Sequence, residues 1–441
     1  MRGRRRRLPT PRVRTRRKGF LAAAFVASLT AGGATAERDW YVDNTSPPGG
    51  DGSAAAPFHE LASAERASAP GDTLHLARGD GTPRGQDRGL RLKPGQRLVG
   101  APGGELPVLS NPAGDALVLA SDVVVEGIAV DGAGGDGIHG TEGGRIALRG
   151  LRVRGVAGDG IELRIAGEAP LDLLVEDSTV EGSGANGVAV VSEGPSSLAR
   201  VTVRRTAVRQ SRGIGLLLFA GGGGHASRLE FTIADNRAAA GHGVLASGAA
   251  GISIQPNDAS RVEGVVADTA VDGAGGRGIE VLGDDAAEAA VVLRGNEVRG
   301  GAFGGIYAAQ QDSGRLDVTL EGNRVGPAAG DAYAVEANAR ESARLCLELA
   351  GAPAAGEVAD LRVRQRETAR VSLAGFSGDG RDRAVVERFL RSRSAAPGRA
   401  SAVLATGVEP AAGGCRRPDD PAREAGPGGA RSTDAEGGGD S

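Results

Sequence analysis

The sequence predicts an all-β fold, a parallel β-solenoid, and three observations support that class. The 441 residues include 74 Gly and only 12 aromatic residues, while 40% are apolar, so small and aliphatic side chains must build the core. Short strands with alternating apolar positions recur every 23 to 35 residues, and units this small must stack, here in about eight to ten turns. Each unit carries a Gly-x-Gly corner before a β-branched residue, where we expect positive φ. The corners are centred on Gly137, Gly160, Gly187, Gly213, Gly243, Gly278 and Gly305.

Residues 1–36 have the features of a secretory signal peptide. They carry ten Lys and Arg and no acidic residue, followed by an apolar stretch at 20–30 and small residues at 34–36. The apolar stretch is shorter than the roughly 20 residues that a spanning helix needs, so we expect cleavage and no membrane span in the mature protein. Arg16-Arg17 resembles a twin-arginine signal, but one residue too many separates the arginine pair from Phe20. Export by the twin-arginine route and export by the Sec route therefore both stay open. The expected location is secreted, periplasmic or cell-surface.

Charge and cysteine content narrow the possible partners. Beyond residue 36 the chain has 42 basic and 55 acidic residues, a formal net charge of −13. Phosphate binding draws on clustered Lys and Arg, so nucleic acid is not an expected partner. The only cysteines are Cys346 and Cys415, and an even pair in an exported chain indicates a disulfide more often than a metal site.

Aligning the repeats places equivalent residues of neighbouring turns roughly 4.8 Å apart. Two outward columns then alternate in charge, which favours opposite-charge pairing between strands. They are Glu126, Arg149, Glu176 and Arg204, and Asp131, Arg154, Glu181 and Arg209. Small polar residues stand at the bend between strands and predict a hydrogen-bonded ladder with a structural role. These are Ser178, Thr206, Asn236, Thr269, Asn296 and Asn323.

The carboxyl end predicts a cap for the last open turn. Val385, Val386, Phe389 and Leu390 have helical spacing, and Asp379 or Asp382 is available to cap the helix. From Pro418 the composition turns to Asp, Pro, Gly, Ser and Glu without apolar periodicity, which predicts a disordered tail over 418–441.

These residues resemble secreted bacterial right-handed parallel β-helix proteins, whose fold is shared by pectate-lyase-like enzymes and by surface and adhesin-like proteins. The likeness rests on Trp40-Tyr41-Val42-Asp43-Asn44 through Pro70-Gly71-Asp72-Thr73-Leu74, on the repeats, and on 345–349 through 413–415, which is similar to the terminal module of β-strand repeat proteins. The resemblance implies a helix over the first turn and a cysteine pair in the terminal module. We therefore divide the chain into a signal peptide (1–36), an N-terminal cap with first strands (37–90), β-helix repeats (91–375), a C-terminal cap (376–417) and the tail.

One constellation has the residue types for chemistry. Asp136 and Asp159 occupy the same corner on adjacent turns, with His139 and Glu162 just after them and Arg164 nearby. Carboxylates one strand spacing apart can bind Ca²⁺ or act as an acid/base pair with a raised pKa. The alternative, which we favour, is that Asp in Gly-Asp-Gly bonds the turn backbone while His and Glu pair in solvent. We expect this corner column to continue as Asn186, Arg212, His242 and Arg277.

Other catalytic signals are weaker. Lyases of this fold commonly use a Lys or Arg base, and Lys93 is the only lysine beyond the signal segment. Gly241-His242-Gly243 resembles an element of polygalacturonase-type hydrolases, but the Asp partners that such enzymes need are missing in order. Aromatic platforms for glycans are few, with Tyr307 expected to face outward and Phe303 at a turn.

The leading hypothesis is therefore a secreted or surface-associated β-helix protein that acts as a non-catalytic structural, adhesive or glycan-interacting scaffold. It needs no cofactor, and its expected partner is a polysaccharide or a cell-surface component. The alternative is a polysaccharide lyase or glycoside hydrolase acting on an acidic polysaccharide, with Asp136, His139, Asp159 and Glu162 as its site and Ca²⁺ on Asp136 and Asp159.

Overall fold

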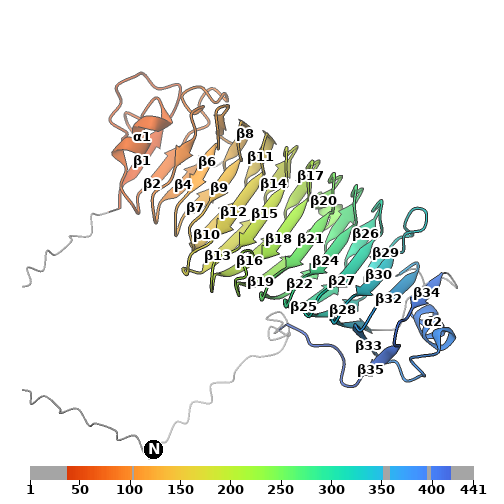
Figure 1. Ribbon diagram of the computed structural model, residues 1–441. Helices are drawn as coiled ribbons and strands as arrows, with labels where there is room; N and C mark the ends of the chain where they lie inside the picture. Colours follow the sequence, from red (N-terminus) through yellow and green to blue (C-terminus); the bar gives the residue numbers. More distant parts are fainter. Residues whose placement is uncertain (1–36, 102–103, 351–357, 395–398, 419–441) are drawn as a thin grey trace, which may run out of the picture. The chain divides into compact units, whose positions relative to one another are not determined.

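The computed structural model describes residues 37–101, 104–350, 358–394 and 399–418. The predicted signal peptide and residues 419–441 of the predicted tail lie outside the described residues. Within them, parallel strands stack into a β-solenoid of about 11 turns, which confirms the predicted all-β fold class (Figure 1). The number of turns exceeds the expected eight to ten because the first and last turns stack without the Gly-x-Gly motif.

Each central turn contributes one strand to each of three parallel sheets, in the chain order 14-stranded, nine-stranded, 12-stranded. The 14-stranded sheet comprises, in order, β1 (Asp39–Val42), β2 (Thr73–Leu76), β4 (Arg97–Gly100), β7 (Val124–Glu126), β10 (Gly144–Arg149), β13 (Leu171–Glu176), β16 (Leu198–Arg204), β19 (Arg228–Ala234), β22 (Arg261–Ala267), β25 (Glu288–Arg294), β28 (Arg315–Glu321), β31 (Arg344–Ala350), β33 (Arg370–Ala374) and β35 (Val408–Ala411).

The other two sheets repeat this pattern. The nine-stranded sheet contains β5 (Val108–Asn111), β8 (Ala129–Ala133), β11 (Arg152–Val156), β14 (Thr179–Glu181), β17 (Ala207–Arg209), β20 (Gly243–Leu245), β23 (Ala270–Asp272), β26 (Glu297–Arg299) and β29 (Arg324–Val325). The 12-stranded sheet contains β3 (Leu90–Arg91), β6 (Leu117–Leu119), β9 (Ile138–Gly140), β12 (Ile161–Ile165), β15 (Val188–Ser192), β18 (Leu216–Ala220), β21 (Ile252–Pro256), β24 (Ile279–Gly283), β27 (Ile306–Gln310), β30 (Val335–Ala339), β32 (Leu361–Gln365) and β34 (Ala400–Val403).

The core is one continuous column of inward-facing aliphatic side chains. Alternate residues of each strand point inward, so Ile161, Leu163 and Ile165 of β12 stack on the equivalent residues of β15. Burial of a Leu, Ile or Val side chain contributes about 1.5–3 kcal/mol, and the three sheets bury such side chains in turn after turn. This accounts for a stable fold with few aromatic residues.

The corner glycines are required for a reason other than the predicted one. Of the seven predicted centres only Gly243 has a positive φ, +121°. At Gly187 a Cβ would lie 2.1 Å from Val208 Cγ1 and 2.5 Å from the Gly215 carbonyl oxygen, so no side chain fits beneath the next turn. The same collision recurs, with a valine of the next turn, at Gly137, Gly160, Gly215, Gly251, Gly278 and Gly305.

The predicted register slips in the middle of the chain. Val188 pairs with Leu216 and Leu216 with Ile252, so the corners equivalent to Gly187 are Gly215 and Gly251, whereas Gly213 and Gly243 were predicted. The chain between β19 and β20 contains an extra 3-10 helix, η1 (Ala238–Ala240), and the Gly-His-Gly motif follows it at the start of β20. His242 is therefore not part of the corner column.

Both predicted surface patterns are confirmed. Arg149 lies in register with Glu126 and Glu176 and pairs with Glu126 at 2.9 Å. The second column has the predicted register and an Arg154–Asp131 ion pair. At the bends, Asn236 Oδ1 accepts the Thr206 N–H at 2.9 Å, and Asn323 Oδ1 accepts the Asn296 N–H at 3.1 Å.

A short helix lies near each end of the described solenoid. In α1 (Leu61–Ala67), Leu61 and Ala64 are buried at the first turns. In α2 (Arg383–Ser392), Val386 and Leu390 are buried, and Asp382, not Asp379, caps the helix by accepting the N–H groups of Ala384 and Val385. No helix in the described ranges is long and apolar enough to cross a bilayer.

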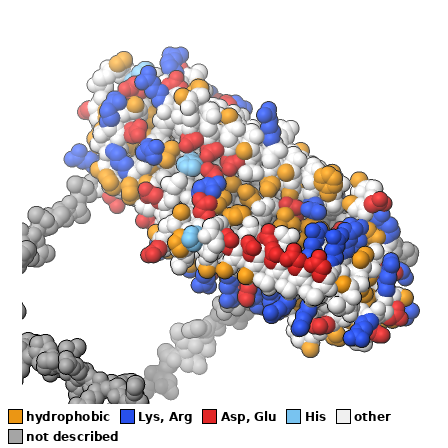
Figure 2. All heavy atoms as spheres, in the orientation of Figure 1, with side chains coloured by type: hydrophobic (Ala, Val, Ile, Leu, Met, Phe, Trp, Pro, Cys, Tyr) orange, Lys and Arg blue, Asp and Glu red, His pale blue; other side chains and the backbone are white. Residues whose placement is uncertain are grey.

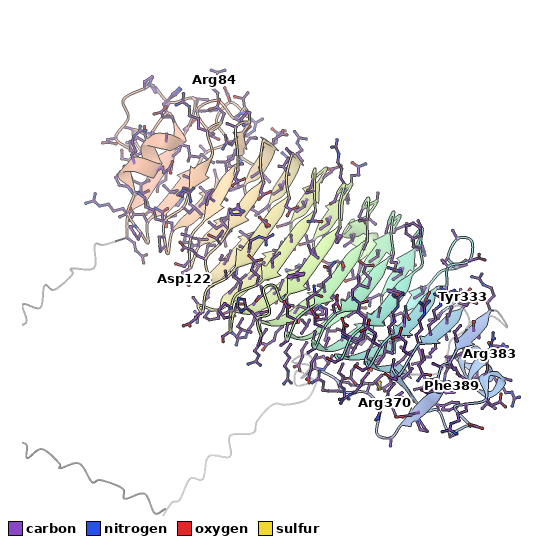
Figure 3. The ribbon with its side chains drawn as sticks, in the orientation of Figure 1. Arg84, Asp122, Tyr333, Arg370, Arg383 and Phe389 are labelled. Atoms are coloured by element: carbon purple, nitrogen blue, oxygen red, sulfur yellow. A yellow bond between two sulfur atoms is a disulfide. The ribbon has the colours of Figure 1, made fainter. Side chains whose placement is uncertain are left out.

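The C-terminal arm, residues 412–418, is attached to the 14-stranded sheet. The Cys346–Cys415 disulfide is present, with Cα atoms 5.6 Å apart, as predicted (Figure 3). Arg416 pairs with Glu288 at 3.1 Å, and Arg417 pairs with Glu348 at 2.6 Å. The described part of the arm ends at Pro418, which is buried.

Candidate functional site

The outward face of the 12-stranded sheet differs in character along its length. At its N-terminal part His139, Glu162 and Arg164 face outward from β9 and β12. In the middle, outward positions on β15 and β18 are apolar, including Val191, Leu217 and Phe219. Figure 2 shows hydrophobic side chains across the middle of the molecule and Lys and Arg side chains gathered towards its C-terminal part.

Three of the four predicted site residues converge. His139 Nδ1 lies 3.1 Å from Asp136 Oδ2 and 3.1 Å from Glu162 Oε2, and Glu162 Oε1 accepts from Arg164 at 3.1 Å. We call Asp136, His139 and Glu162 the acid–histidine cluster. Asp159 lies at the same corner one turn on, but among the described residues it forms no hydrogen bond or ion pair with His139.

The corner aspartates have a backbone role that explains their recurrence. Asp136 Oδ1 accepts the Asp159 N–H at 2.8 Å, and Asp159 Oδ1 accepts the Asn186 N–H at 2.6 Å. Asn186 continues the pattern by accepting the Ile214 N–H at 2.9 Å. The column beyond Asn186 is Ile214, Ala250 and Arg277, so Arg212 and His242 were placed in it wrongly.

Burial shifts the acidity of this corner. Desolvation raises the pKa of Asp136, and the nearby charges of Glu162 and Asp115 raise it further. Desolvation likewise raises the pKa of Asp159, with Asp136 and Glu162 adding to the effect. Two carboxylates within hydrogen-bond distance of the same imidazole nitrogen are residue types that can act in general acid–base catalysis.

The corner suits Ca²⁺ poorly. Asp115, Asp136 and His139 bring ligand atoms within 4.8 Å of one another, but Ca²⁺ takes 6–8 oxygen ligands and imidazole is not among its usual donors. The Oδ1 atoms of Asp136 and Asp159 are already engaged by backbone N–H groups. A bound cation would therefore have to compete with the stacking of the turns.

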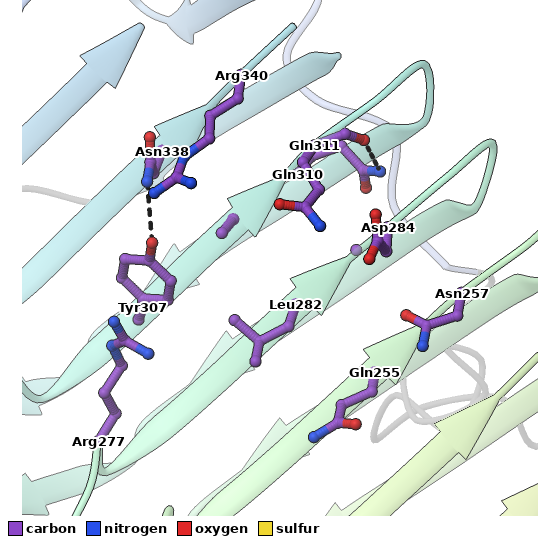
Figure 4. A pocket seen from close by; sticks show the side chains of 12 residues that line it. Gln255, Asn257, Arg277, Leu282, Asp284, Tyr307, Gln310, Gln311, Asn338 and Arg340 are labelled. Carbon is purple, nitrogen blue, oxygen red and sulfur yellow. Dashed lines mark hydrogen bonds between the residues drawn. The ribbon is translucent and has the colours of Figure 1, made fainter. Parts of the chain in front are cut away.

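A second site on the same face is a pocket above β21, β24, β27 and β30, which we call the sheet pocket (Figure 4). Its volume is about 390 Å³, within the range of about 300–1,000 Å³ typical of small-molecule sites. Polar side chains from four turns line it above an apolar floor that includes Leu282. They include Gln255, Arg277, Asp284, Tyr307, Asn338 and Arg340.

The C-terminal side of the sheet pocket is ordered around Tyr307. The Arg277 guanidinium stacks on the tyrosine ring with Cζ 3.6 Å from the ring centroid, and Asn338 Nδ2 donates to the tyrosine hydroxyl at 2.9 Å. Glu280, just outside the pocket, accepts from Ser253 at 2.9 Å and pairs with Arg277 at 3.3 Å. These contacts hold the ring in place.

One edge of the sheet pocket is acidic, because Asp284 of the lining lies with Asp285 and Asp312, with carboxylate oxygens within 4.8 Å of one another. Partial burial of Asp284 alone would raise the pKa, but hydrogen bonds with Gln311 and Asp312 outweigh burial and lower the pKa of Asp284. Asp284 is therefore ionised at neutral pH and presents acceptor oxygens to the pocket.

Sequence reasoning singled out two lining residues of this pocket, Tyr307 by its outward position and Arg277 by its place in the corner column. The others come from turns 27 to 29 residues apart, so no local motif joins them. Counting four residues on from the corners Gly251, Gly278 and Gly305 would have placed Gln255, Leu282 and Ala309 in adjacent register, with Asn338 following in the next turn.

The stacked parallel sheets with this outward face define a right-handed parallel β-helix protein. Residues 119–325 match the family described as "Right handed beta helix region", in agreement with the resemblance of the repeats. No curated protein matches the chain. A crystal structure of GH136 lacto-N-biosidase from Eubacterium ramulus is similar at 10% identity, covering 85% of this chain and 68% of that chain with a TM-score of 0.32. Such a remote likeness carries no argument about function.

Proposed function

We propose that the protein is exported and acts outside the cell as a non-catalytic β-helix scaffold that binds a glycan in the sheet pocket. The observation that carries the proposal is the arrangement of Tyr307, Asn338, Gln255 and Asp284 around one cavity. Amide and carboxylate groups pair with sugar hydroxyls, and an aromatic ring beside an apolar floor suits the C–H faces of a pyranose. Most of the lining side chains are polar, and Leu282 and Ala309 are its apolar part, which suits a ligand rich in hydroxyl groups.

The acid–histidine cluster lies too far from the sheet pocket to act on a sugar bound there. Three strand spacings separate β12 from β21, the nearest strand of the pocket, a distance of roughly 14 Å. A general acid or base must reach the reacting atoms within hydrogen-bond distance. Binding in the pocket is therefore separate from any chemistry at the cluster.

One observation favours a second candidate function, hydrolysis or lyase cleavage of a polysaccharide at the cluster itself. Asp136 and Glu162 meet at the same His139 nitrogen, and the pKa of Asp136 is raised, as a general acid requires. Against it stands the backbone role of Asp136, which explains this residue without catalysis.

The two functions are tested on the full chain with a panel of acidic and neutral polysaccharides, by measuring retention, new reducing ends and unsaturated products. We expect retention without cleavage. The pocket variant Tyr307→Ala with Asn338→Ala should lose retention at least tenfold, and the matched cluster variant His139→Ala with Glu162→Gln should bind as the unaltered chain does. Cleavage that the cluster variant abolishes would replace this proposal with the enzymatic one.

Export is tested by determining the amino terminus of the protein recovered outside the cell, which should lie near Glu37.

A further inference from the structure

The two arginines of the sheet pocket differ in their partners. Arg277 stacks on Tyr307 and pairs with Glu280 at 3.3 Å, so its charge is largely balanced. Arg340 follows β30 and, within the described ranges, has no carboxylate within 4.0 Å of its guanidinium. Several other arginines on this sheet face are paired, as Arg164 is with Glu162 and Glu193, whereas Arg366, one turn on from Arg340, is like Arg340 in having no ion pair among the described residues. Arg340 therefore presents an uncompensated positive charge to the pocket.

Asn338 presents an unmet hydrogen-bonding group at the same place. Its side chain is buried, with 2% of the residue exposed, and one polar atom of the amide bonds the Tyr307 hydroxyl. The other polar atom, Oδ1, has no partner among the described residues. If the amide were turned over, Nδ2 would be unpaired instead, so one of the two atoms lacks a partner in either orientation. A buried polar atom without a partner costs about 1–3 kcal/mol, which a ligand hydroxyl would recover. Figure 4 shows the Arg340 side chain extending towards Asn338.

We infer that the sheet pocket selects a sugar with an anionic substituent, a carboxylate or a sulfate ester. Arg340 binds the anion, and Asn338 pairs with a neighbouring ring hydroxyl. Guanidinium groups form charge-assisted hydrogen bonds with such anions. The inference rests on the proposed function, because it names the class of sugar that the proposed glycan site takes.

The remaining charges of the pocket set the orientation of the sugar. Asp284 lies on the Gln311 side of the cavity, and its carboxylate clusters with those of Asp285 and Asp312. This acidic edge repels an anion and accepts hydrogen bonds from neutral hydroxyls. Glu280 is occupied by Arg277 and Ser253. The anionic substituent therefore lies at Arg340 and Asn338, and the uncharged edge of the ring lies towards Asp284.

The test compares two pairs of probes on the full chain by titration calorimetry at fixed ionic strength. The first pair is oligogalacturonate and its methyl ester, and the second is dextran sulfate and dextran. We expect the acidic member of at least one pair to bind at least tenfold more tightly than its neutral partner, and the pair that shows the preference identifies the anion. Arg340→Gln should remove most of this preference. Arg366→Gln is the matched control, because Arg366 occupies the same column one turn on, is exposed and lies outside the pocket lining.

Three results would overturn the inference, and they are distinguishable. Equal binding of acidic and neutral probes leaves the glycan-binding proposal in place and removes the anion selectivity. An equal loss in Arg340→Gln and Arg366→Gln assigns the preference to the general charge of the surface. Binding of none of the four probes contradicts the proposed function and the inference together. Thermal unfolding of each variant, compared with the unaltered chain, separates lost binding from lost folding.

Discussion

Single side chains at the corner before the 12-stranded sheet decide how closely successive turns stack. Gly187 has no room for a Cβ, because Val208 and the Gly215 carbonyl occupy that space. Asp159, at the equivalent corner one turn earlier, accepts the N–H of Asn186, the residue before Gly187, at 2.6 Å. Each corner thus combines a missing side chain with a short polar one that bonds the backbone.

Gly187→Ala should lower the free energy of unfolding by about 2–3 kcal/mol, because the added methyl overpacks a rigid corner. Urea unfolding followed by circular dichroism measures the change. Gly167→Ala is the control, since a Cβ there meets nothing within 4 Å and the glycine has no positive φ. Equal stability of the two variants would show that an added methyl group at position 187 does not clash with the next turn.

Asp159→Asn should be more stable than the unaltered chain at pH 7. Because burial raises the folded-state pKa of Asp159, its carboxyl stabilises the fold below the ordinary value of 3.8 and loses that contribution as the pH rises through the folded pKa. Asn keeps the acceptor oxygen without the charge, as Asn186 does one turn on. The advantage should therefore vanish below pH 3.8.

The control at the same position is Asp159→Ala, which leaves the Asn186 N–H without its acceptor and should cost about 1–3 kcal/mol at either pH. Urea unfolding at pH 7 and pH 3.5 measures both variants. A less stable Asp159→Asn at pH 7 would show that the ionised carboxylate is favourable here.

At the scale of elements, the C-terminal arm ties the end of the chain to the 14-stranded sheet. The arm buries Asp317 of β28 completely, with 0% exposed, and Arg416 and Arg315 pair with this carboxylate. A charge so deeply buried requires such partners, because desolvation is costly. The disulfide sets the position of the arm, and the ion pairs then follow from its register over the sheet.

Replacing both cysteines with Ala should lower stability by about 2–4 kcal/mol, because the Cys346–Cys415 bridge closes a sequence separation of 69 residues. Calorimetry with and without reductant measures the effect. The reductant should lower the midpoint of the unaltered chain and leave the cysteine-free variant unchanged. A reductant effect on the cysteine-free variant would assign the loss to something other than the bridge.

At the scale of the whole molecule, every turn depends on its neighbours for burial. The hydrophobic core runs through all three sheets as one cluster, and α2 covers it near β32 and β34. An uncovered last turn would present apolar side chains together with unpaired strand edges, which promote association between chains. Capping is therefore a requirement of the stack as a whole.

A chain ending at residue 375 should form soluble oligomers or aggregates, because Val363 and Leu373 lose the cover of α2 and of the last strands. Size-exclusion chromatography with light scattering measures this. A chain ending at residue 418 is the control for shortening, and the full chain without both cysteines is the control for the lost bridge. A monodisperse truncated chain would show that the last turn needs no cap.

Much of the fold was predictable because it repeats. Charge alternation from Glu126 to Arg204 predicted the register of four consecutive turns, and the polar bend residues predicted the ladder that the structure contains. The predicted register slipped first at Gly213, because the Gly213-Ile214-Gly215 sequence contains two glycines and the second one is the corner. It slipped again where one turn is enlarged around η1, because periodicity in a sequence carries no information about how an insertion loops out, and this misplaced His242 in the corner column.

Of the two candidate sites, one was predictable from the repeat and the other was not. The convergence of Asp136, His139 and Glu162 was predictable because they lie on adjacent turns at equal offsets from a glycine corner. The sheet pocket was not, since the orientation of Arg340 and the unpaired amide of Asn338 depend on side chains from turns distant in sequence. The sequence by itself determined the parallel β-helix, its disulfide and its ladders, because each follows from local repetition. Only the tertiary structure decided which outward residues surround a cavity, because that depends on how several turns with different side chains lie against one another.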